Sequence, residues 1–115
     1  MQIDGIWTVE HYGISGWTKA GVLFFQNGRI MGGNDDQYVV GTYEASDDIY
    51  KILLEVTLLK APEAVFTVEG NKLPIQIEGK LDGNTFTGTA NQLDKAAFQA
   101  PIRLMSILTL YENLV

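Results

Sequence analysis

Short apolar stretches alternate along the chain with turns rich in glycine, asparagine and aspartate. The turns follow one another every 8 to 12 positions or so, which is roughly the spacing of small all-β sandwiches and barrels. Residues 85–90 alternate cleanly between threonine and apolar or small residues, as a strand with one buried face does. The pattern predicts strands at 3–12, 17–26, 29–31, 38–44, 49–59, 73–80, 85–90 and 101–111.

Two turns join predicted strands directly. Asn27 and Gly28 form the strongest short hairpin signal, because both central residues of a type I′ turn need positive φ, and residues 82–84 predict a second hairpin turn. Residues 60–64 suit a bend or a short helical turn, 65–69 a short strand, and 91–98 one helical turn. We therefore predict an all-β fold, a small closed or nearly closed antiparallel barrel of about eight strands with at most one short helix.

The last predicted strand is apolar on both faces. Simple alternation places Ile102, Leu104, Leu108 and Leu110 on one face. A strand buried on both faces needs a second layer against its outer side, and 49–59 shows a weaker form of the same pattern. Two interpretations stay open: residues 91–98 cover this side, or two copies associate through it. The homodimer interface would contain Arg103, Met105, Ile107 and Tyr111.

Composition limits the class of protein. The 115 residues fit a single domain, 1–115, and 46% hydrophobic residues suit a packed core. The chain has no cysteine, lacks a leader pattern and contains no apolar run of about 20 residues, so we expect a cytoplasmic protein without a membrane segment. A net charge of −6 with scattered basic residues argues against direct binding of nucleic acid.

No set of residues suggests catalysis. His11 is the only histidine, and a catalytic or metal-binding histidine needs partners of suitable type. The acidic pairs 35–36 and 47–48 lack the alternating spacing of a calcium loop, and aspartate is common in turns for its local hydrogen bonds. We therefore predict a protein that is not an enzyme and has no metal or cofactor.

Two family resemblances narrow the expectation. Gly5, Ile6 and Trp7 resemble the Gly-x-Trp opening of lipocalins, which implies that Arg103 in the last strand stacks on Trp7. A second likeness covers most of the chain: 4–7, the run 21–34 with its Asn-Gly turn and Gly-Gly-Asn loop, Tyr38, Gly41 and the acidic turn before Ile49. These elements resemble the GrlR-type negative regulators of type III secretion and their bacterial relatives.

The second resemblance implies both fold and function. Members of that family have a small lipocalin-like barrel, dimerise and bind a transcriptional activator protein through an acidic four-residue turn. Residues 45–48 occupy that position, of which Asp47 and Asp48 are acidic. The resemblance therefore implies a non-enzymatic negative regulator that binds a basic regulatory protein through Ser46, Asp47 and Asp48.

A different function stays open beside this one. An eight-stranded barrel lies at the boundary between a packed interior and room for one small ligand. The chain is rich enough in aromatic residues to line such a cavity with Trp7, Phe24, Tyr43 and Phe86. This second hypothesis predicts a carrier of a small apolar molecule.

Overall fold

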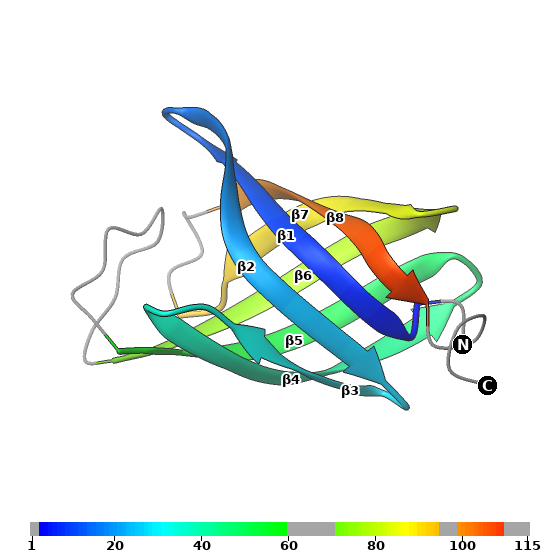
Figure 1. Cartoon of the computed structure of the whole chain (residues 1–115), viewed down its shortest axis with the longest axis horizontal. Coiled ribbons are helices and arrows are strands. Elements are labelled where there is room, and N and C mark those ends of the chain that lie inside the picture. Colours follow the sequence, from blue (N-terminus) through cyan, green and yellow to red (C-terminus); the bar gives the residue numbers. More distant parts are fainter. Residues whose placement is uncertain (1–2, 60–70, 95–98, 110–115) are drawn as a thin grey trace.

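The computed structural model describes residues 3–59, 71–94 and 99–109. Eight antiparallel strands pair with their neighbours in sequence, and the last pairs with the first, so the sheet closes into a barrel (Figure 1). These ranges contain no helix, and the predicted all-β antiparallel barrel is confirmed. The strands are β1 (Gly5–Gly13), β2 (Gly16–Gln26), β3 (Arg29–Gly33), β4 (Gln37–Ser46), β5 (Ile49–Leu58), β6 (Lys72–Asp82), β7 (Thr85–Gln92) and β8 (Gln99–Thr109).

The residues predicted to form a helical turn begin instead as a strand. Asn91 and Gln92 continue β7 and pair with Gln76 and Ile75 of β6. Because their backbone groups are used in the sheet, the segment cannot start a helix there. The remaining part of this prediction, at 95–98, and the interpretations of 60–64 and 65–69 lie outside the described residues.

Side chains alternate between the inside and the outside of the barrel wall. The inward set forms one buried cluster that runs through all eight strands. Five of its aromatic rings contact one another in sequence across the interior, with ring centroids 5.3 to 6.5 Å apart. Tilted and edge-to-face contacts at this distance add to the stability gained by burying the rings. The five rings belong to Trp7, Phe25, Tyr43, Tyr50 and Phe86.

A buried carboxylate lies at the end of the barrel where β1 begins. Asp4 accepts a hydrogen bond from the Tyr43 hydroxyl, and its other oxygen accepts one from the backbone N–H of Asn27 at 3.2 Å. Trp7 donates its indole N–H to the carbonyl of Ile3 at 2.8 Å. Burial, followed by the hydrogen bond to Asp4, raises the pKa of Tyr43 to about 12. The polar groups of Trp7 and Tyr43 are thus satisfied within the chain.

A bulge shifts the alternation of the last strand. Opposite β1, the last strand has an extra residue, Ile107, because Trp7 pairs with Ser106 and Ile6 with Leu108. Directly paired residues share a face of the sheet, so Leu108 lies beside the outward Ile6. The prediction that Leu108 shares a face with Ile102 and Leu104 is therefore wrong, because a one-residue bulge reverses the alternation beyond it.

Candidate partner-binding surfaces

The predicted partner-binding residues form the exposed hairpin turn between β4 and β5. Ser46, Asp47 and Asp48 are all exposed. Asp47 adopts a φ of 60°, a left-handed conformation that aspartate tolerates better than most residues. The turn is therefore formed by local chemistry, and it presents two carboxylates to solvent at the end of a rigid ladder.

The two carboxylates have different surroundings. Asp48 forms an ion pair with Lys80 at 3.5 Å, and both side chains are more than half exposed. Within the ranges described here, Asp47 forms no ion pair. The backbone N–H of Leu81 donates to the carbonyl of Asp48 at 3.0 Å, which brings the end of β6 against the turn. Asp47 is thus the carboxylate most available to an external cation.

A third acidic residue lies near this turn, and sequence reasoning did not assign it to the site. Asp82 is exposed at the end of β6, just before the turn to β7, and follows Leu81, whose backbone contacts Asp48. In an up-and-down barrel, alternate turns lie at the same end. Asp82 and Gly83, next to each other where β6 meets its turn, therefore carried a usable signal once the strand count was known. We refer to Asp47, Asp48 and Asp82 as the acidic end of the barrel.

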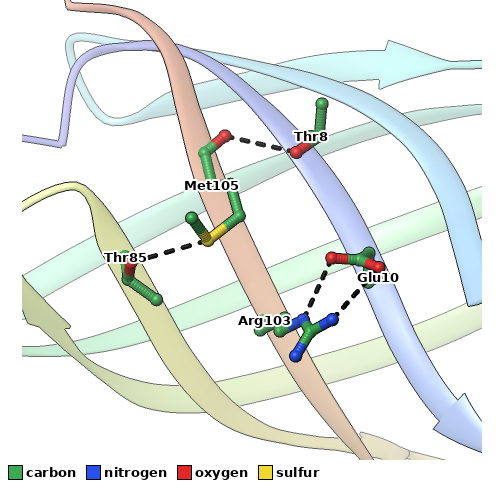
Figure 2. A network of polar contacts seen from close by, with 5 residues as sticks. All are labelled: Thr8, Glu10, Thr85, Arg103 and Met105. Atoms are coloured by element: carbon green, nitrogen blue, oxygen red, sulfur yellow. Dashed lines mark hydrogen bonds and ion pairs between the residues drawn. The ribbon is translucent and has the colours of Figure 1, made fainter. Parts of the chain in front are cut away.

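The residues predicted for the dimer interface divide into two kinds. Met105 and Ile107 are exposed on the outer face of β8, Ile107 at 58%. Arg103 is instead engaged within the chain: its Nε and Nη2 donate to the two carboxylate oxygens of Glu10 at 3.0 and 3.3 Å (Figure 2). This ion pair lowers the pKa of Glu10. Tyr111 lies outside the described residues.

Polar contacts join β8 to both of its neighbours beside Met105. Thr85 of β7 donates to the Met105 sulfur at 3.5 Å, and Thr8 of β1 donates to the Met105 carbonyl at 3.4 Å (Figure 2). These contacts fix the position of Met105 on the outer surface of the barrel, beside the outward residues of β1.

An uncharged surface extends from β8 across four further strands. Ile6 pairs with Phe24, Phe24 with Met31, and Met31 with Val40, while a parallel row joins Thr8, Val22, Gly33 and Tyr38. None of these residues is charged, and Met31 is 56% exposed. We call this surface, together with Met105 and Ile107, the outer apolar face. Contiguous apolar surface of this kind commonly marks an interaction site.

The predicted stacking of Arg103 on Trp7 does not occur. The Arg103 guanidinium carbon lies 4.1 Å from the ring centroid of Trp17. Trp7 points into the barrel and is 2% exposed, whereas Arg103 and its partner Glu10 lie on the outer side of the wall. Since the two residues are on opposite faces of the sheet, the lipocalin-type contact is replaced here by a contact with the other tryptophan.

Three of the four residues proposed to line a ligand cavity point inward. Trp7, Tyr43 and Phe86 belong to the buried aromatic row. Phe24 lies on the outer face opposite Ile6, because Phe25 takes the inward position beside it. Since consecutive residues of a strand face opposite sides, only one of the two phenylalanines can line the interior.

The described residues also bear on metal and acid–base chemistry. No group of three or more histidine, aspartate or glutamate side chains gathers there in a way that could hold a metal ion. Burial lowers the pKa of His11, and no hydrogen-bond partner of its Nδ1 is found in the described ranges. Likewise, in the parts of the chain that are described, no helix could span a membrane.

Comparison of the sequence with known proteins identifies no family, so the protein is classified by its fold. No protein-family model matches the chain, and no curated protein is significantly similar to it in sequence. The fold defines the class: a small closed antiparallel β-barrel of eight strands, compatible with a lipocalin-like barrel.

Proposed function

We propose that this protein is a non-enzymatic, cytoplasmic regulator that binds a basic protein partner at the acidic end of the barrel. The observation that carries the proposal is the exposed turn in which Asp47 has no ion pair among the described residues. Asp48 lies beside it, and Asp82 lies nearby at the end of β6. The resemblance to GrlR-type negative regulators adds a partner class, a transcriptional activator, to this electrostatic argument.

Charge and packing both support this function. A net charge of −6 attracts basic proteins over distances of about a Debye length, roughly 8 Å at physiological salt. Exposed aspartates on a rigid hairpin need little reorganisation to meet lysine or arginine side chains. The ring contacts among Trp7, Phe25 and Tyr43 inside the barrel favour this function over carriage of a small apolar molecule.

The test compares binding by closely matched variants. Asp47→Asn removes one charge while keeping a residue that tolerates positive φ, so the turn is preserved. Glu78→Gln removes one charge from the exposed outer side of β6 and serves as the control. Proteins captured from a lysate of the source organism are identified, and the affinity of each purified basic candidate is then measured.

The expected result is a basic DNA-binding regulator whose affinity falls roughly threefold to tenfold with Asp47→Asn and further with Asp48→Asn, values typical of exposed or partly desolvated ion pairs. Glu78→Gln leaves the affinity unchanged, and added salt weakens the complex. Capture of no basic protein, or equal affinity for all variants, contradicts the proposal.

We also propose that two copies associate through the outer apolar face. Met31, Val40, Met105 and Ile107 are large apolar side chains at or above two-fifths exposure, and homodimer interfaces are enriched in such surface. Light scattering at micromolar concentration should give twice the chain mass of 12.7 kDa. Met31→Lys should give the mass of one chain. Thr89→Lys, a control on the exposed side of β7, should still give the mass of two chains. The mass of one chain for the unmodified protein would refute the dimer.

A further inference from the structure

The β1–β2 hairpin leaves a stretch of strand edge open at one end of the barrel. β2 pairs with β3 only from Val22 to Gln26, while its residues 16–20 continue alongside β1. On the side away from β1, no described strand pairs with these residues. In Figure 1 the β1–β2 hairpin (blue) projects beyond the body of the barrel. Unpaired strand edges are templates for the addition of another strand.

The ladder determines which backbone groups face this edge. Gly13 and Gly16 flank a two-residue turn, and pairing continues through Tyr12 with Trp17 and Glu10 with Lys19. In such a hairpin the flanking pair is hydrogen-bonded, and hydrogen-bonded and non-hydrogen-bonded pairs then alternate. The N–H and C=O groups of Trp17 and Lys19 therefore point away from β1, toward the open side.

A side chain already forms a hydrogen bond with this edge at Ala20, the end nearer to β3. Asn34 donates its amide to the carbonyl of Ala20 at 3.1 Å, and it accepts the backbone N–H of Asp36 at 2.8 Å. A donor therefore approaches β2 from the open side at Ala20.

The side chains beside the edge indicate what would bind there. Trp17 is 39% exposed and is held by an edge-to-face contact with Tyr12 at 5.4 Å and by the Arg103 guanidinium. Lys19 has no ion pair within the described part of the chain, since the nearby Glu10 carboxylate is bound by Arg103. The strand at this edge thus carries a fixed aromatic side chain at Trp17 and, two residues further along, an exposed lysine. Lys19 attracts Glu10 electrostatically but forms no ion pair with it.

We propose that the open edge of β2 at Trp17 and Lys19 accepts an extended peptide strand. Only an extended backbone matches alternating donors and acceptors along a strand edge. A β-branched or aromatic side chain of the added strand lies beside Trp17, and an acidic one lies beside Lys19, because favourable cross-strand pairs are of these kinds. The site goes beyond the proposed function, since it lies at the opposite end of the barrel from Asp47 and binds a strand instead of a basic surface.

The experiment uses the full chain and a defined probe. The probe is a fluorescein-labelled, amidated peptide of sequence threonine–valine–threonine–isoleucine–threonine–glutamate–threonine, whose apolar and acidic residues share one face. Binding is measured by anisotropy, and backbone amide signals are followed by NMR. We expect saturable binding with the largest amide shifts at Trp17 and Lys19. A peptide with lysine in place of the glutamate should bind about threefold more weakly, as for an exposed ion pair.

Two controls separate backbone pairing from other contacts. Lys19→Pro removes the N–H that faces the open edge, and proline is tolerated at such positions of a strand. This variant should weaken peptide binding about tenfold. Lys19→Ala keeps the N–H and should weaken peptide binding by no more than about threefold. A peptide N-methylated at alternate amides should not bind the unmodified protein, a test that needs no variant. Equal binding of methylated and unmethylated peptides, absence of binding, or shifts confined to the acidic end overturns the proposal. Asp47→Asn should leave peptide binding unchanged.

Discussion

The buried contact between Tyr43 and Asp4 allows the sharpest test of how this barrel is stabilised. Tyr43→Phe removes one hydroxyl and leaves the ring between Phe25 and Tyr50 in place. Among the described residues, Asp4, 8% exposed, then keeps only the N–H of Asn27 as a donor. A hydrogen bond to a charged group contributes about 1.5 to 3 kcal/mol, so we expect the free energy of unfolding to fall by about 2 kcal/mol.

Denaturant unfolding measures this loss directly. The fluorescence of Trp7, in edge contact with Phe25, reports the transition, and the shift of its midpoint at constant slope gives the change in free energy. Tyr38→Phe is the matched control, because Tyr38 is half exposed and surface changes of this kind stay within about 0.5 kcal/mol. Asp4→Asn combined with Tyr43→Phe completes a double-mutant cycle, with an expected coupling of at least about 1 kcal/mol.

The same contact predicts that the free energy of unfolding depends on pH in the alkaline range. The pKa of Tyr43 is raised from 10.0 to about 12 in the folded protein, so the protonated hydroxyl stabilises the fold. This contribution is complete below pH 10 and is lost as the pH rises toward 12. The stability difference between the unmodified protein and Tyr43→Phe should shrink across that interval. A difference below about 0.5 kcal/mol at pH 7, or a coupling near zero, would refute the reasoning.

Three further predictions concern single sites. Gly41→Ala should lower the free energy of unfolding by about 2 kcal/mol or more in the same denaturant assay, since a Cβ there would overlap the backbone of Leu53. NMR titration should give a pKa of His11 below 6.5, because burial lowers it. The neutral imidazole therefore stabilises the fold above pH 6.5, and this contribution is lost as the pH falls. A pKa above 6.5 would contradict the burial argument. Arg103→Gln should raise the pKa of Glu10 toward its usual value, as measured from the NMR signal of the carboxyl carbon. The ion pair stabilises the fold above pH 4.5 and is lost in acid. An unchanged pKa would show that Arg103 does not lower the pKa of Glu10.

The strand positions and the exposed acidic turn follow from local rules. Alternation in 85–90 and the turn at Asn27 and Gly28 depend on side-chain direction and allowed φ, which neighbouring residues determine. Asp47 and Asp48 are exposed for the same reason, because they occupy a tight turn between two strands. These features could be predicted without knowing where the rest of the chain lies.

Local rules could not choose a face where a stretch is apolar throughout. Residues 22–25 contain no polar residue, so nothing in the pattern decided that Phe25 points inward and Phe24 outward. The bulge at Ile107 could not be predicted either, because it depends on how β8 aligns with β1. A one-residue shift in register reverses every side chain beyond it.

Closure of the barrel decided the remaining features. It brings Asp82 near Asp48, Arg103 onto Trp17 and Asp4 against Tyr43, contacts between residues far apart in sequence. It also leaves residues 16–20 of β2 without a neighbour on one side, since the strands are staggered around the barrel. Strand stagger and closure are properties of all eight strands together, whereas alternation and turn chemistry act over a few residues; for this reason the sequence predicts the elements, and only the tertiary structure determines their contacts.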